Sequence, residues 1–169
     1  MKTWTLGLLF AVLAVPAGQA DDQLLSFSGG IGVDPVSGIA AGAPAPNVVR
    51  KVGPGGAPWT IAKLTANIDV SGRIQVRGRG LLLAGGDGIG TNGNQSVHAI
   101  LFCGPAATAT AHSTPAAGVP LAANGDFSID DSLSPAPPNP CTTPVLLIAN
   151  PAPRWFAAGI LANDDEDKD

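Results

Sequence analysis

The sequence is short of the residue types from which most active sites are built. Among its 169 residues there is no tyrosine, one methionine, two histidines and two cysteines. The single glutamate is Glu166, close to the end of the chain. Charged residues make up 13% and aromatic residues 5%. This inventory excludes a zinc site with several thiolate ligands, an acid/base pair of glutamates and a long coiled coil.

What the chain has in quantity is glycine, proline and apolar side chains. It contains 22 glycines and 16 prolines, and 45% of its residues are apolar. This apolar content is too high for a fully disordered protein, and the length fits one domain. The many glycines and prolines predict short elements joined by turns.

The first twenty residues predict export. Lys2 is followed by an apolar run over residues 6–15, and the small residues Gly18 and Ala20 lie at the −3 and −1 positions of a cleavage site. The pattern is typical of a signal peptide over residues 1–20, whose apolar core is too short to span a bilayer. We therefore expect a secreted mature chain, extracellular or periplasmic, with no membrane span after cleavage.

The charges of the mature chain are concentrated at its end. Eight basic residues face thirteen acidic ones once Lys2 is removed, a net charge of −5. Residues 164–169 supply −4 of this charge and are predicted to be a disordered acidic tail. The remaining body is nearly neutral and has no general attraction for nucleic acid, so no nucleic-acid partner is expected.

Cys103 and Cys141 are predicted to form a structural disulfide, because two cysteines in an exported protein most often pair. They would close a loop of about 39 residues, which the chain-entropy model values at about 4 kcal/mol. No C-x-x-C motif is present, which gives a redox role little support.

The region before residue 58 differs in composition from the rest. Residues 21–57 are predicted to form an arm rich in glycine and proline, with short edge strands at 24–27 and 30–33. Residues 58–163 are predicted to form the β domain, because apolar and polar side chains alternate there with a period of two.

Directly opposite residues of an antiparallel pair lie on the same face of the sheet, and this rule predicts the register of two hairpins. A three-residue loop at 70–72 places Ile68 opposite Ile74 and Asp69 opposite Arg73, whereas a two-residue turn would place Ile68 opposite Gln75. Gly72 then takes the left-handed position of the loop. The same argument predicts a three-residue loop at 123–125, with Leu121 opposite Phe127 and Val119 opposite Ile129.

Further strands are predicted at 96–103, 145–148 and 155–160, the first of them central because both its faces are apolar. No segment after residue 20 has helical periodicity with caps. The predicted fold is an all-β, single antiparallel β-sandwich, immunoglobulin-like or similar, with about seven short strands and one disulfide. A small open β-barrel is the second choice. No Trp lies between Cys103 and Cys141, which excludes a true immunoglobulin domain.

The glycine-rich stretch 85–93 is the candidate ligand loop. The glycines at 88, 90 and 93 fit G-x-G-x-x-G, but a dinucleotide site also needs a following helix and an acid about 20 residues on, and both are missing. A bulged loop between two strands explains the composition. If the loop binds a ligand, its contacts are expected from Gly86, Asp87, Gly88, Gly90 and Asn92.

His98 and His112 are the only imidazoles, and a hydrolase or metal enzyme would need them to meet an aspartate such as Asp87 or Asp126. There is no G-x-S-x-G nucleophile elbow and no H-x-H or H-x-x-x-H spacing. We assign no catalytic residue, no metal site and no cofactor. Ordinary hydrogen-bonded histidines, at the strand surface or near a loop, are the simpler interpretation.

Two other clusters are candidate binding features. Arg73, Arg77 and Arg79 share one strand face, which is either a solvent face or a surface for an anionic polymer such as an acidic polysaccharide. Trp59, Trp155 and Phe156 form either core or a sugar-stacking platform, and core is the simpler interpretation.

These observations favour a non-catalytic binding or structural module. The alternatives are a secreted hydrolase or metal-dependent enzyme using His98, His112 and an Asp, and a cell-surface adhesin-type subunit with exposed strand edges. The sequence identifies no partner, although a polysaccharide or a protein ligand fits the module interpretation.

Overall fold

The computed structural model describes residues 22–162. The predicted signal peptide (1–20) and acidic tail (164–169) lie outside the described residues. Within them every regular element is a strand, and none is a helix that could span a membrane. The prediction of an all-β protein is confirmed.

Fourteen strands are formed by the described residues, rather than about seven, because the connections rich in glycine and proline add short pairs. In chain order they are β1 (Gln23–Gly32), β2 (Val36–Ala40), β3 (Ala43–Pro46), β4 (Gly53–Pro54), β5 (Trp59–Thr60), β6 (Lys63–Asp69), β7 (Arg73–Arg79), β8 (Leu82–Leu83), β9 (Ser96–Cys103), β10 (Thr110–Ser113), β11 (Val119–Pro120), β12 (Phe127–Ser132), β13 (Val145–Ala149) and β14 (Arg154–Leu161).

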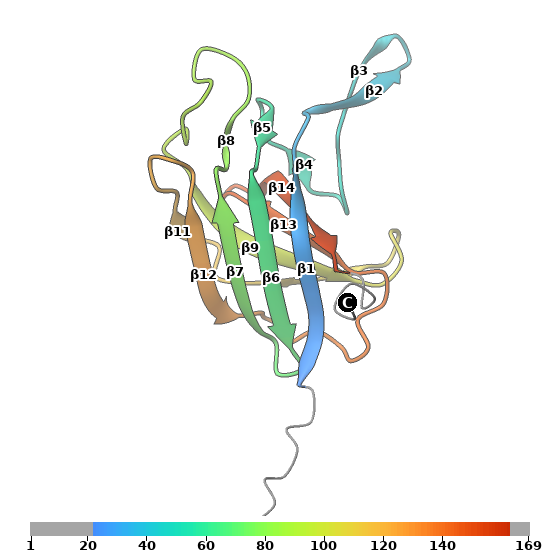
Figure 1. The fold of residues 1–169 in the computed structure, drawn as a ribbon. Helices are drawn as coiled ribbons and strands as arrows, with labels where there is room; N and C mark the ends of the chain where they lie inside the picture. Colours follow the sequence, from blue (N-terminus) through green and yellow to red (C-terminus); the bar gives the residue numbers. More distant parts are fainter. Residues whose placement is uncertain (1–21, 163–169) are drawn as a thin grey trace, which may run out of the picture.

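One large sheet contains most of these strands, in the order β10-β9-β13-β14-β1-β6-β7-β12. All its pairs are antiparallel except the short contact between β14 and β4. The sheet curls so that β1, β6, β7 and β12 form a front layer and β9, β13 and β14 cross behind it (Figure 1). Because β11 pairs with β9 and leads through a short loop into β12, the sheet nearly closes. The result is a sandwich-like, nearly closed barrel.

The core fills the space between the two layers. Strands β6 and β7 alternate strictly, burying apolar residues such as Leu64, Ile68 and Val76 and exposing the polar residues between them. In β9 every residue after Ser96 is buried, so both faces of this strand are covered. The prediction of a central strand over 96–103 is confirmed, because β9 has neighbours on both sides.

The β6–β7 hairpin has the predicted register. Ile68 lies opposite Ile74, and Gly72 has a φ of 87°, in the left-handed region. The expected charge pair between Asp69 and Arg73 takes a different form. The carboxylate of Asp69 accepts a hydrogen bond from the Arg73 backbone N–H at 3.1 Å, while the Arg73 guanidinium reaches across to β12.

The second hairpin prediction is right at the loop and wrong beyond it. The Ala122 N–H donates to the Asp126 carbonyl at 2.9 Å, which closes a three-residue loop with Gly125 at a φ of 79°. Val119, however, pairs with Val97 of β9 rather than with Ile129. Ile129 pairs instead with Val76. The two strands separate after the loop because each joins a different edge of the curled sheet.

The prediction of two short edge strands near the start of the chain is also wrong. Residues 23–32 form the single strand β1, which pairs with β6 on one side and β14 on the other. A register shift around Gly29 bends this strand along the barrel wall. The glycines that suggest a loose segment allow close packing here: a Cβ on Gly30 would lie 2.8 Å from Leu64.

The predicted disulfide is present. Cys103, at the end of β9, is bonded to Cys141, and their Cα atoms are 5.0 Å apart. Both cysteines are buried. The bond ties the segment after β12 to the rear layer, next to β13.

Candidate functional site

The two histidines lie on opposite faces of the sheet. His112 of β10 pairs with Leu101 of β9, and Leu101 is three positions from His98 on the same strand. Side chains three positions apart on a strand point to opposite faces and are separated by about 10 Å along it. The convergence of His98 and His112 that the enzyme alternative requires is therefore not found.

Each imidazole is buried in its own environment. Burial lowers the pKa of His98, an effect that a hydrogen bond with the Ala149 backbone opposes, and His98 Nδ1 has no hydrogen-bond partner among the described residues. His112 Nδ1 lies 2.8 Å from the carbonyl oxygen of Pro135, which fixes Nδ1 as the donor. Both are core histidines.

The aspartates named with them do not complete a site. Asp87 is exposed in the loop before β9. The Asp126 carboxylate accepts two hydrogen bonds, both at 3.0 Å. One comes from the Asn124 side-chain amide in the same turn and the other from the Gly80 backbone N–H after β7. No group of three or more potential metal ligands occurs among residues 22–162.

The candidate ligand loop is a compact turn held by its own hydrogen bonds. The Gly90 N–H donates to the Leu83 carbonyl, and the Thr91 N–H donates to the Gly88 carbonyl. The Asn92 side chain donates to the Leu121 and Ala122 carbonyls, so it braces the neighbouring loop. Gly86 and Asp87 remain exposed at the tip. Ligand binding by this loop stays a prediction.

The arginine face is exposed as the alternation implies. Arg73, Arg77 and Arg79 point outward from β7, while Ile74, Val76 and Gly78 between them are buried. Lys63 of β6 lies directly opposite Arg79. We call Lys63, Arg77 and Arg79 the cationic cluster.

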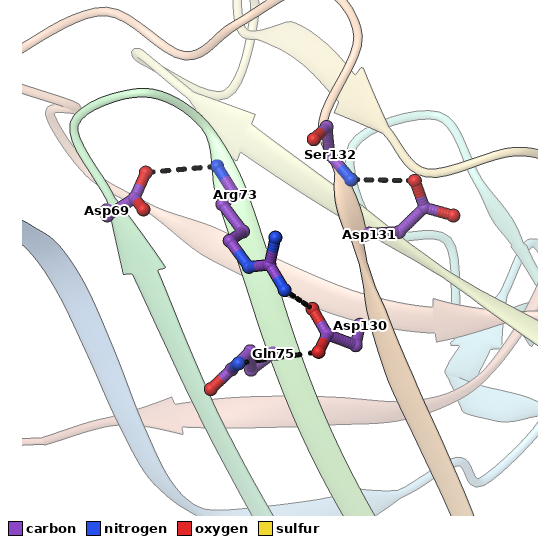
Figure 2. A network of polar contacts seen from close by, with 6 residues as sticks. All are labelled: Asp69, Arg73, Gln75, Asp130, Asp131 and Ser132. Atoms are coloured by element: carbon purple, nitrogen blue, oxygen red, sulfur yellow. Dashed lines mark hydrogen bonds and ion pairs between the residues drawn. The ribbon is translucent and has the colours of Figure 1, made fainter.

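The two ends of this face differ in charge balance. At the Arg73 end, the guanidinium forms a salt bridge with Asp130 of β12 at 2.7 Å, and Gln75 contacts the same carboxylate (Figure 2). The Asp69 carboxylate lies beside them, and its hydrogen bond to the Ser71 hydroxyl lowers its pKa. The positive charge of Arg73 is therefore compensated at this end.

At the other end the cationic cluster has no salt bridge, because the bridge of Arg73 is the only one among the described residues. Directly opposed side chains on an antiparallel pair have Cβ atoms roughly 5 Å apart, and like charges there are destabilising. The nearest carboxylate by register is Asp126, whose oxygens already accept the two hydrogen bonds described above. The cluster is thus a site of net positive charge on two paired strands: it has three cations and one neighbouring carboxylate, and none of the three cations forms a salt bridge among the described residues.

The aromatic residues are mainly core, as the simpler interpretation expects. Trp59, Trp155 and Phe156 are 6%, 4% and 3% exposed. Trp59 stacks on Phe156 with ring centroids 4.1 Å apart, and Trp155 Nε1 donates to the Asn47 carbonyl at 2.9 Å. No broad aromatic platform lies on the surface of the described residues.

The sequence reasoning overlooked the β2–β3 hairpin. It projects away from the barrel, and every residue of β2 is exposed (Figure 1). Ile39 in β2 is 71% exposed. The signal for it was available: Ala41-Gly42 is a turn sequence between two apolar runs, without a charge from Val36 to Asn47.

Comparison of the chain with protein-family models, with curated proteins and with solved structures found no significant match.

Proposed function

We propose that this protein is a non-catalytic extracellular binding module, and that the cationic cluster binds an acidic polysaccharide. One observation carries the proposal: Lys63 and Arg79 are held directly opposite each other, next to Arg77, with no salt bridge among the described residues. The repulsion between Lys63 and Arg79 destabilises the fold, and a bound anion would reduce this repulsion.

The shape of the face supports an extended ligand. The three side chains project from the two paired strands β6 and β7, on an exposed face rather than in a cleft. Guanidinium groups match carboxylates with paired hydrogen bonds, which suits a chain of uronic acids. The paired strands already fix the backbone positions from which the charges project. Binding therefore costs little backbone conformational entropy.

The test is the affinity of the full chain for polygalacturonate, measured by calorimetry at low salt. Arg77→Gln removes one charge from the cluster, and we expect it to weaken binding about tenfold, equivalent to 1.4 kcal/mol. Lys51→Gln is the matched control, because it removes one charge from an exposed turn outside the cluster. It should change the affinity less than twofold.

Two results would overturn the proposal. One is the absence of binding to polygalacturonate at low salt. The other is an equal loss in Arg77→Gln and Lys51→Gln, which would indicate attraction to net charge rather than to the cluster. Binding should also weaken as salt is added, because the site is exposed.

A second candidate, the adhesin-type subunit, is favoured by the β2–β3 hairpin. Its strands pair with each other and with no other strand of the described chain. Two prolines in β3 remove backbone donors from one edge, whereas β2 contains no proline. Light scattering over a concentration series tests this candidate, which requires assembly that the substitution Ile39→Asp abolishes.

A further inference from the structure

A small hollow lies at the end of the barrel where β5 and β8 approach the turn between β13 and β14. Its volume is about 260 Å³. Its walls are the Trp59–Phe156 stack, the backbone of residues 55–57, and the side chains of Gln95, Asn150 and Arg154. This hollow is separate from the cationic cluster, none of whose residues lines it.

Glycines keep the aromatic wall of the hollow open. A Cβ on Gly55 would lie 2.9 Å from the Phe156 ring and 3.1 Å from Trp59 Nε1. A Cβ on Gly93 would lie 3.3 Å from the far edge of the Trp59 ring. Any side chain at these positions would therefore crowd the stack. The indole edge of Trp59 is left as an apolar surface with one N–H donor.

The amide side chains form a fixed wall. Asn150 Nδ2 donates to Gln95 Oε1 at 3.2 Å, and Gln95 Nε2 donates to the Gly93 carbonyl at 3.0 Å. Asn150 Oδ1 accepts the backbone N–H of Arg154 at 2.9 Å. These hydrogen bonds to each other and to the backbone hold both amide side chains in place, so they define this wall of the hollow.

Arg154 supplies the charge at the hollow. It pairs with Gly53 of β4, and a Cβ on Gly53 would lie 2.5 Å from Arg154 Nη1. The absence of a side chain at Gly53 is therefore what allows the guanidinium to lie over β4. Arg154 has no salt bridge within residues 22–162. An unpaired guanidinium beside an apolar aromatic edge is suited to a small organic acid.

We propose that this hollow binds an organic acid of about the size of one sugar unit, with its carboxylate on Arg154 and its body against Trp59. The site does not depend on polysaccharide binding by the cationic cluster. The two can succeed or fail separately, since they share no residue.

The probe is galacturonate, followed by the indole N–H resonances of the full chain in a proton–nitrogen NMR titration. Trp59 Nε1 borders the hollow, whereas Trp155 Nε1 is hydrogen-bonded to Asn47 elsewhere and serves as an internal control. We expect a saturable shift of the Trp59 resonance and little change at Trp155. Galactose, which has the same ring without the carboxylate, should bind at least tenfold more weakly.

Three variants test the residues. Arg154→Gln should weaken the galacturonate binding seen at Trp59 at least tenfold, and Lys51→Gln, which removes an exposed charge outside the hollow and the cationic cluster, should leave it unchanged. Gly56 lines the hollow, and an added Cβ would meet no atom within 4 Å, so Gly56→Leu should fold normally and we expect its side chain to obstruct the hollow. It should abolish the Trp59 shift.

The proposal is overturned by any of three results: no saturable shift at Trp59, equal affinity for galactose and galacturonate, or equal losses in Arg154→Gln and Lys51→Gln. Retained binding in Gly56→Leu would also contradict it, because the ligand would then lie outside the hollow.

Discussion

At the scale of single residues, burial decides what His98 can do. The side chain is 3% exposed, and its Nδ1 has no hydrogen-bond partner among the described residues. Burial disfavours the charged imidazolium, so the pKa of His98 is lowered from its usual value of 6.5. A buried histidine whose pKa is lowered in the folded state contributes to the pH dependence of stability.

The lowered pKa of His98 gives the first prediction at this scale. The unfolded chain binds a proton near pH 6.5, while the folded chain binds it only at lower pH. The contribution of His98 to stability is therefore complete above pH 6.5 and is lost as the pH falls through the folded-state pKa. Urea unfolding should show wild type losing more stability between pH 7.5 and pH 5.5 than His98→Gln loses. Equal losses would contradict the assignment.

The neighbours of His98 in the sequence predict its strand but not the strands that pair with it. Alternation predicts a strand at 96–103, and an apolar pattern on both faces predicts a central one. The strand neighbours of β9 come from segments distant in the chain, as the pairing of His98 with Ala149 illustrates. By contrast, Arg77 could be placed on the solvent face directly, because its neighbours Val76 and Gly78 point inward.

At the scale of elements, local turns were predictable and their partners were not. The loop at 70–72 follows from matching Ile68 with Ile74, since both belong to one short hairpin. The pairing of β11 with β9 depends on the curl of the whole sheet. The glycines of β1 led to the prediction of a loose arm. The β-propensity of single residues does not reveal the close packing of Gly30 against Leu64, which depends on the tertiary structure.

Two glycines with similar backbone angles provide a prediction at the element scale. Gly125 has a φ of 79° and Gly86 a φ of 74°. A Cβ on Gly125 would lie 2.6 Å from the backbone of Leu81, whereas one on Gly86 would meet nothing within 4 Å. Gly125→Ala should therefore cost about 2–4 kcal/mol of unfolding free energy. Gly86→Ala should cost about 1 kcal/mol.

Urea denaturation of both variants measures the difference, with an unchanged m-value as the sign that only stability has changed. Similar losses in the two variants would show that the contact between the 123–125 loop and Leu81 is not tight.

At the scale of the whole molecule, the curled sheet separates the surface features from one another. The cationic cluster lies on the front layer, the β2–β3 hairpin projects from the barrel, and the glycine-rich loop follows β8 (Figure 1). Arg73 belongs to the same strand face as the cluster, but its salt bridge with Asp130 sets it apart. The sequence could identify the shared face, yet this charge balance depends on the pairing of β7 with the distant β12.

The most direct test of polysaccharide binding is a backbone NMR titration of the full chain with short oligogalacturonates. We predict that the largest shifts fall on residues 63–65 and 76–80, around Lys63, Arg77 and Arg79, with smaller changes at the Arg73 end, where the positive charge is compensated. Shifts confined to the glycine-rich loop 85–93 or to the β2–β3 hairpin, or no shifts at all, would contradict the claim that the cationic cluster is the binding surface.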